Sequence, residues 1–367
     1  MDALTTLSNW QRVRLGDIFF ITAGGDLSKP HYSNTKQSDF NYPIYSNAIE
    51  KKGLYGYSSF FIIKNKSITI TSRGTIGVAF FRDYPYVPIG RLLVLQPKIS
   101  NIDCRFYTEY INSKVKFNTE QTTIPQLTIP KVALCEIPLP PLNEQIAIAN
   151  ILSDVDRYLY SLRALILKKE NVKKALSFEL LSQRKRLKGF NQNWQRVRLG
   201  DICEITTGSL DANEMVHYGK YRFYTCAKEY YFIDKYAFDT EAILISGNGY
   251  VGYVHYYKGK FNAYQRTYVL DNFSEHIMFV KYFLTMFLQS HIQTNRNEGN
   301  IPYIVMATLK DFEILLPPLN EQIAIANILS DLDSEIISLK NKKRQFENIK
   351  KALNHDLMST KIRVLKK

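Results

Sequence analysis

The chain has 367 residues, which is enough for two or more domains with hydrophobic cores. Lys and Arg number 48 against 34 Asp and Glu, and a net charge of +14 favours a polyanionic partner over an ordinary basic cytosolic protein. The cysteines Cys104, Cys135, Cys203 and Cys226 show no CxxC spacing, and the N-terminus lacks the apolar segment of a signal peptide. No apolar window is long enough to cross a membrane. We therefore expect a cytoplasmic protein with reduced thiols.

Two motifs occur twice in the chain. Asn9–Ile18 has the sequence NWQRVRLGDI, which returns unchanged at Asn193–Ile202. Leu139–Asp154 has the sequence LPPLNEQIAIANILSD, which returns unchanged at Leu316–Asp331. A repeat near 180 residues is too long for a solenoid and indicates duplication of a whole domain with its helix. The expected boundaries are a variable domain at 1–138, a conserved helix at 139–189, a second variable domain at 190–315 and a second helix at 316–367.

The variable domains share a few features despite their divergence. A strand is predicted at 67–71 and at 242–245, and each enters a glycine turn, Gly74/Gly77 or Gly249/Gly252. Arg91 and Arg266 match at the same offset of 175 as these glycines. A helix is expected at 105–115 and at 275–292, and a strand at 135–139 and 312–316 leads into each long helix. Each half is therefore predicted to be an α+β domain with a twisted, mostly antiparallel sheet.

Each conserved segment is predicted to form a single long helix. Asn143 and Asn320 are candidate N-caps, and Gly189 is a candidate stop because no Gly or Pro lies between Asn143 and Lys188. That length corresponds to roughly 70 Å. The apolar spacing is close to a heptad, which needs a partner helix, and we expect the two helices to pair with each other. The predicted seam consists of Leu152, Val155, Leu159, Leu162, Ile166, Leu176 and Leu180, then Leu329, Leu332, Ile336, Leu339, Phe346, Leu353 and Leu357, with Lys169, Lys173, Lys343 and Lys350 as interruptions.

The sequence does not favour catalysis by this chain. LPPL is similar to the NPPY-type motif of amino-methyltransferases, but it lacks the Asn or Asp that holds the target amine. A GxxG turn could hold a phosphate, but these turns lack the features of a P-loop or a Rossmann fingerprint. Tight β-turns that only glycine can make are the favoured interpretation. The histidines have no metal-ligand spacing, so we expect no catalytic residue, no metal and no cofactor in this chain.

Polar residues beside the glycine turns are candidate ligand contacts on a rigid sheet edge. Arg and Lys pair with guanine, Asn and Gln with adenine, and aromatic side chains contact thymine methyl groups. Arg91 and Arg266 could equally be structural, each held by a carboxylate. The candidate base-contacting residues are Arg73, Thr75, Arg91, Gln126, Asn248, Tyr250, Gln265, Arg266 and Tyr303.

In this combination and order, the motifs resemble the specificity (S) subunit of Type I restriction–modification systems. The resemblance covers essentially the whole chain and includes the Ile124-Pro125 and Ile301-Pro302 elements. It implies two target-recognition domains, each of which reads one half of a split double-stranded DNA site, with the two helices as an antiparallel coiled-coil spacer. It also implies that two methyltransferase (M) subunits bind around the helices and that restriction (R) subunits join them, with S-adenosylmethionine and ATP on those partners.

The identical helix starts suggest docking surfaces for two copies of one partner. The residues expected to be exposed there are Asn143, Glu144, Gln145 and Asn150, and their copies Asn320, Glu321, Gln322 and Asn327. Two other classes remain open. A DNA-bridging architectural protein would bind without sequence preference, and an enzyme with a hidden site would need convergent acid, base or metal groups.

Overall fold

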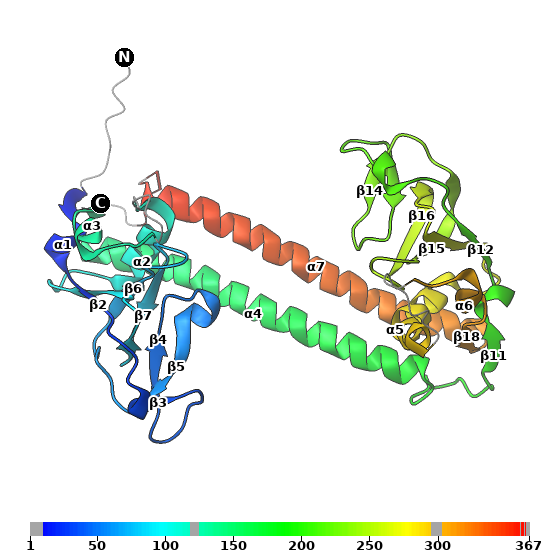
Figure 1. The fold of residues 1–367 in the computed structure, drawn as a ribbon, viewed down its shortest axis with the longest axis horizontal. Coiled ribbons are helices and arrows are strands. Elements are labelled where there is room, and N and C mark those ends of the chain that lie inside the picture. Colours follow the sequence, from blue (N-terminus) through cyan, green and yellow to red (C-terminus); the bar gives the residue numbers. More distant parts are fainter. Residues whose placement is uncertain (1–9, 118–124, 295–302, 360, 363, 365–367) are drawn as a thin grey trace, which may run out of the picture. The chain divides into compact units, whose positions relative to one another are not determined.

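The computed structural model describes residues 10–117, 125–294, 303–359, 361, 362 and 364. The chain divides into two compact units, one of Met1–Arg163 with Lys342–Lys367 and one of Ala164–Asn341 (Figure 1). Each unit contains one variable domain and about half of each long helix.

In the first unit, the opening motif pairs with the strand that precedes the long helix. Strand β1 (Gln11–Arg14) lies antiparallel to β10 (Glu136–Leu139), and the short helix α1 (Leu15–Ile18) follows β1. The remaining strands form two four-stranded sheets, in the orders β2-β9-β6-β7 and β3-β5-β4-β8. Their bounds are β2 Phe19–Ala23, β3 Tyr32–Ser33, β4 Tyr42–Tyr45, β5 Leu54–Ser58, β6 Ser67–Ile70, β7 Ala79–Arg82, β8 Val87–Pro88 and β9 Leu93–Pro97.

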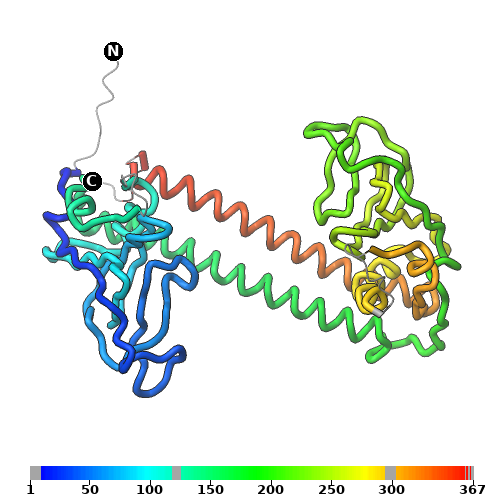
Figure 2. Tube along the Cα trace, in the orientation of Figure 1, coloured from blue at the N-terminus to red at the C-terminus, as the bar shows by residue number. Residues whose placement is uncertain are grey.

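The second unit repeats this plan with one larger sheet, and its path can be followed in Figure 2. Strand β11 (Gln195–Arg198) pairs antiparallel with β18 (Glu313–Leu316), and six strands form a sheet in the order β12-β17-β15-β16-β13-β14. Their bounds are β12 Glu204–Thr207, β13 Tyr221–Tyr224, β14 Tyr231–Ile233, β15 Phe238–Ser246, β16 Val254–Ala263 and β17 Thr267–Asp271. The named strands pair antiparallel except for β4 with β8 and β13 with β16, so the predicted fold class is confirmed.

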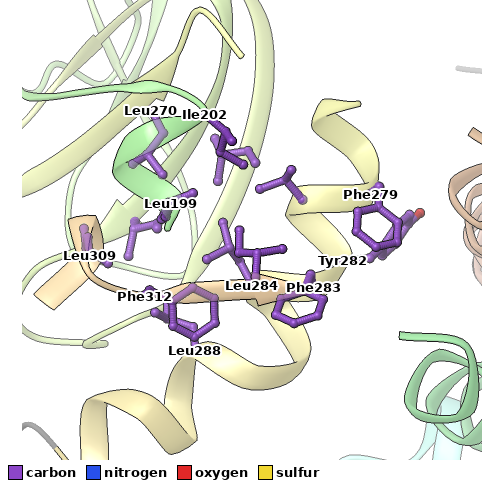
Figure 3. Close-up of a cluster of buried hydrophobic side chains, with 14 of the residues drawn as sticks. Leu199, Ile202, Leu270, Phe279, Tyr282, Phe283, Leu284, Leu288, Leu309 and Phe312 are labelled. Carbon is purple, nitrogen blue, oxygen red and sulfur yellow. The ribbon is translucent and has the colours of Figure 1, made fainter. Parts of the chain in front are cut away.

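One helix covers the sheet in each variable domain, and a shorter one precedes the last strand. These are α2 (Cys104–Lys114) and α3 (Ile129–Ala133) in the first unit, and α5 (Ile277–Thr294) and α6 (Met306–Lys310) in the second. In the second unit the apolar face of α5 packs against residues of the sheet and of the segment after β11 (Figure 3). Phe279, Phe283 and Leu288 of α5 are nearly or fully buried there, so the core lies between α5 and the sheet.

The long helices are α4 (Leu142–Leu181) and α7 (Leu319–Met358), each of 40 residues and so about 60 Å long. The predicted N-caps are wrong, because α4 begins at Leu142 and the carbonyl of Pro141 accepts the first helical hydrogen bond, from the amide of Gln145. The predicted end at Lys188 is also wrong. The chain turns at Gln183, which has a left-handed φ of 60°, and Gly189 lies in a later turn.

The two helices pair antiparallel, and the contacts within each unit show it. In the first unit, Tyr158 packs on Phe346 with ring centroids 4.5 Å apart, and Arg163 forms an ion pair with Glu347 at 3.0 Å. In the second unit, Lys169 pairs with Glu335 at 2.8 Å, and Lys173 pairs with Asp333. The predicted seam is buried or half-buried throughout, and all four lysines that interrupt it take part in ion pairs.

Each long helix ends in the core of a unit other than the one in which it begins. Leu180 and Leu181, at the end of α4, are buried in the core of the second unit. Leu357 and Met358, at the end of α7, are buried in the core of the first unit. The two repeats therefore depend on each other for folding, because the core of the first unit includes the end of α7 and the core of the second unit includes the end of α4.

Candidate nucleic-acid interface

In the first unit, hydrogen bonds fasten together the loops that carry the candidate residues. The side-chain carbonyl of Asn47 accepts from the Ser72 amide at 2.7 Å, and its NH2 group donates to the Gly90 carbonyl at 2.7 Å. The Ser72 hydroxyl donates to the Arg91 carbonyl at 2.6 Å, and the Leu127 amide donates to the Ser72 carbonyl at 2.9 Å. The loops that carry Arg73, Arg91 and Gln126 therefore meet at one place.

The second unit builds the same meeting point with different residues. The Gly247 amide donates to the Arg266 carbonyl at 2.8 Å, and the Ile304 amide donates to the Gly247 carbonyl at 3.0 Å. Cys226, which occupies the position of Asn47, donates its thiol to the Arg266 carbonyl at 3.3 Å and accepts at its own carbonyl from the Tyr250 amide at 3.1 Å. Asn248, Tyr250, Gln265, Arg266 and Tyr303 all lie on the loops that these bonds join. We call each set of joined loops the loop frame of its unit.

The four glycines of the turns have left-handed backbones, as the β-turn interpretation requires. Their φ angles are 68° at Gly74, 89° at Gly77, 59° at Gly249 and 74° at Gly252. A side chain at Gly252 would bring its Cβ to 2.5 Å from the Ile292 side chain. The glycines therefore shape the loops.

The candidate side chains on these loops are mostly exposed. Arg73, Thr75, Arg91, Tyr250, Gln265, Arg266 and Tyr303 are exposed, and Gln126 and Asn248 are partly exposed. In the first unit, Arg73 Nη2 donates to Gln126 Oε1 at 3.2 Å. In the second, the Lys228 ammonium lies 5.0 Å from the centre of the Tyr250 ring. Each loop frame thus holds several exposed polar or aromatic groups close together, although their contacts with DNA stay a prediction.

The alternative of a carboxylate partner for the matched arginines finds no support. Among the described residues, no ion pair involves Arg73, Arg91 or Arg266. Arg91 has a left-handed φ of 62°, directly after Gly90 at 63°, and the Ile89 carbonyl accepts from the Leu92 amide across this turn. A non-glycine residue in this region is strained and needs support from its surroundings. The loop frame provides that support.

Asn47 and Cys226 were not identified from the sequence as residues whose side chains hold the loop frames together. The alignment of YPIYSNA with YRFYTCA marks these two residues as equivalent, but it does not predict the hydrogen bonds that their side chains form. Of the Ile-Pro elements, Ile124, Ile301 and Pro302 lie outside the described residues, whereas Pro125 is described and exposed.

The identical motifs contact each other inside each unit. The Trp10 indole N–H donates to Glu144 at 3.0 Å, and the Trp194 indole N–H donates to Glu321 at 3.1 Å. Glu321 is fully buried and also accepts two bonds from Arg186, at 2.6 and 3.2 Å. Shared sequence at these positions therefore follows from shared internal packing.

The expectation of exposed residues at the helix starts is wrong for part of the set. Gln145, Glu321 and Gln322 are buried, and Glu144 is partly buried. Gln145 accepts from the Asp103 amide at 2.8 Å, and Gln322 accepts from the His276 amide at 3.0 Å, so each anchors the loop before α2 or α5. A helix start has two sides, and the sequence alone did not show which residues face the domain.

Four of the eight expected residues are solvent-accessible at the helix starts, together with apolar neighbours that are also identical in the two copies. Asn143, Ile146, Asn150 and their copies Asn320, Ile323 and Asn327 are exposed, as is Leu319, and Leu142 is partly exposed. Their spacing places them on one side of each helix. We call Leu142, Asn143, Ile146 and Asn150, with Leu319, Asn320, Ile323 and Asn327, the helix-start faces. In the first unit this face adjoins a cavity of about 590 Å³ lined by Leu142, Ile146, Ile99, Lys66 and Arg105.

The described part of the chain contains no cluster of metal ligands, and its cysteines form no disulfide. No group of three or more His, Cys, Asp or Glu side chains that could hold a metal occurs among these residues. The four cysteines are free, and burial raises the pKa of the Cys104 and Cys203 thiols to about 12, which keeps both protonated at neutral pH. None of the described helices is both long and apolar enough to cross a membrane.

Comparison with known structures shows which solved structures share this fold. The chain superposes on the S subunit of a Type I restriction–modification system from M. genitalium with a TM-score of 0.71 and 19% identity, covering 97% of this chain and 98% of that one. The fold is thus that of a duplicated two-domain protein with two long helices.

Comparison of sequences identifies the family. Residues 7–174 and 191–348 each match the type I restriction modification DNA specificity domain, so the chain belongs to that family. It is 38% identical over 170 residues to the EcoDI specificity subunit of Escherichia coli, a match that covers 46% of this chain but only 37% of that subunit's length. It is 24% identical over 417 aligned residues to the MjaVIII specificity subunit of Methanocaldococcus jannaschii, covering 99% of this chain and 95% of that one.

Proposed function

We propose that this chain is the DNA sequence-recognition subunit of a Type I restriction–modification complex, with each variable domain binding one half of a bipartite site. One observation carries the proposal. The same loop frame occurs in both units, but the side chains on it differ, with Arg73 and Gln126 in one and Asn248 and Tyr303 in the other. Two loop frames with the same backbone contacts but different exposed side chains would present different groups to two different half-sites. The net charge of +14 supports phosphate binding without regard to sequence.

In this proposal the chain performs no chemistry itself and acts in the cytoplasm. S-adenosylmethionine and ATP belong to methyltransferase (M) and restriction (R) subunits, which bind around it. The helix-start faces support docking of two M subunits, because the identical residues Ile146 and Ile323 are each 38% exposed. Contiguous exposed apolar patches are typical of protein interaction sites.

The helix pair serves as the spacer between the half-sites. A rod built from a paired apolar seam and ion pairs resists bending better than a loop, so its length fixes the number of unread base pairs at about 3.4 Å each. The described seam and the four paired lysines support this role.

Methylation mapping tests the proposal directly. The chain is expressed with its M subunit, and methylated positions are mapped on genomic DNA and on selected random DNA pools. We expect methylation at one split, asymmetric sequence, and a complex of two M subunits with one copy of this chain.

Two results would contradict the proposal in different ways. DNA binding that depends on salt but selects no sequence would indicate an architectural protein. Methylation of DNA by the isolated chain would show that it is itself catalytic.

A further inference from the structure

The Arg73–Gln126 hydrogen bond determines what this pair can offer a ligand. Gln126 Oε1 accepts from Arg73 Nη2, so the amide oxygen is turned toward the guanidinium and the amide NH2 group remains for another partner. Arg73 retains most of its five N–H donors. Both side chains thus offer mainly donors at their accessible atoms.

The loop frame holds this pair in place. The residues next to Arg73 and Gln126, Ser72 and Leu127, are joined by the 2.9 Å bond between the Leu127 amide and the Ser72 carbonyl. Gly74 follows with a left-handed φ of 68°, and a Cβ placed there would meet no atom within 4 Å. Among the described residues nothing crowds Gly74, and a backbone hydrogen bond joins the two segments that carry the pair.

Base edges in the major groove differ in the hydrogen-bond acceptors and donors that they present. Guanine presents two acceptors, N7 and O6, and adenine presents the acceptor N7 beside an amino donor, while cytosine presents an amino donor and thymine presents one acceptor and a methyl group. A group of donors can therefore form two bonds with guanine but only one with adenine or thymine, and at adenine and cytosine it also faces an amino donor. The chemistry of the pair therefore favours guanine.

We propose that Arg73 and Gln126 act together to select a guanine in the half-site bound by the first variable domain. This inference rests on the proposed function and adds the base class that one domain recognises. The second domain carries Asn248 and Tyr303 at the same places, and no hydrogen bond joins them among the described residues. An amide that offers both donor and acceptor suits adenine, so this guanine preference belongs to the first domain alone.

The test exchanges the pair between the domains. One variant carries R73N and Q126Y, which places the second domain's residues in the first, and the matched control carries N248R and Y303Q. Each is purified with the M subunit and used to select sites from random DNA, beside the wild type. Urea unfolding of each variant checks that it folds.

We expect the wild type to prefer guanine at one position of one half-site by roughly 5- to 150-fold over adenine. R73N/Q126Y should lose that preference and leave the other half-site and the spacer unchanged. The control should leave this guanine in place and alter only the other half-site. A third variant, R73K, keeps the charge and loses the planar fork, so it should weaken the guanine preference while the salt dependence of binding stays the same.

Three results would overturn the inference. In the first, the half-site bound by the first domain contains no fixed guanine, and in the second, the double variant keeps the wild-type preference. In the third, the double variant weakens binding equally on every sequence, which would make Arg73 a phosphate contact. If the wild type selects no split sequence at all, the proposed function itself fails, and that outcome is distinct from these three.

Discussion

The two units share their internal contacts and differ at their surfaces. Trp10 with Glu144 and Trp194 with Glu321 repeat the same bond, and the Leu127–Ser72 and Ile304–Gly247 backbone bonds repeat the same loop frame. The exposed tips of the loops have diverged, as Arg73 and Asn248 show. After a duplication, residues that hold a fold are constrained in both copies, whereas exposed loop tips can change without unfolding either copy.

Some exposed positions do not follow this division, and the helix-start faces are among them. Ile146 and Ile323 are exposed and yet identical. One partner that binds both copies would explain this identity, and recent duplication or gene conversion would also leave identical stretches.

The largest effect should come from lengthening the shared spacer. One heptad is inserted after Lys169 in α4 and one after Phe346 in α7, so that the apolar seam keeps its register. Each helix becomes longer by roughly 10 Å, which corresponds to about three base pairs. Methylation mapping should show unchanged half-sites with a wider gap. Retention of the original gap at full affinity would contradict the spacer role.

Charge on a helix-start face should remove one M subunit at a time. Ile146→Asp and Ile323→Asp each place a carboxylate in the proposed interface, and we expect binding of one of the two M subunits to weaken by roughly 10-fold or more. Native mass spectrometry measures the stoichiometry. Ile337→Asp, on α7 outside these faces and 59% exposed, is the matched control and should still bind two. Equal loss in the control would show a general effect of charge on the helices.

The two identical glutamates should differ in their importance for stability. Glu321→Ala leaves Arg186 and Trp194 without their acceptor in a buried site, and we expect a loss of about 2–4 kcal/mol in unfolding free energy. Glu144→Ala removes only the bond from Trp10 at a half-buried position and should cost about 1 kcal/mol. Urea unfolding measures both. Equal losses would mean that Arg186 contributes nothing.

The smallest effect should appear in acid, at one ion pair of the second unit. Burial alone would raise the pKa of Asp333, but hydrogen bonds from Lys173 and Tyr282 outweigh it, so the pKa lies below its usual value. The pair therefore contributes stability above the unfolded pKa near 4, and that contribution is lost as pH falls through the lower folded pKa. Asp333→Asn should lower stability by less than about 1 kcal/mol at pH 7. Unfolding curves of variant and wild type should converge toward pH 2, and a constant difference would contradict this cause.

Much of the fold could be predicted because its signals are local or repeated. The heptad spacing of Leu152, Leu159 and Ile166 predicted a paired helix, and the structure buries all three. The matched offsets of Gly74 with Gly249 and Arg91 with Arg266 predicted equivalent loops, and each unit brings its own members together. The ends of the long helices were mistaken, because a stretch without Gly or Pro permits a helix but does not require one. The fold ends α4 at Leu181, where its last turn enters a core.

The duplication, the class of fold, the paired helices and the positions of polar groups on the loops can be read from the sequence, because these depend on periodicity and on aligned identities within one chain. Which identical residues face inward is visible only in the folded structure. Gln145 and Glu321 are polar and lie at a helix start, yet they are buried, because the loop before α2 and the indole of Trp194 need their hydrogen bonds. Burial depends on contacts between residues more than 40 positions apart. No local sequence pattern encodes such contacts. These long-range contacts distinguish the identical residues that stabilise the domains from the identical residues that remain exposed.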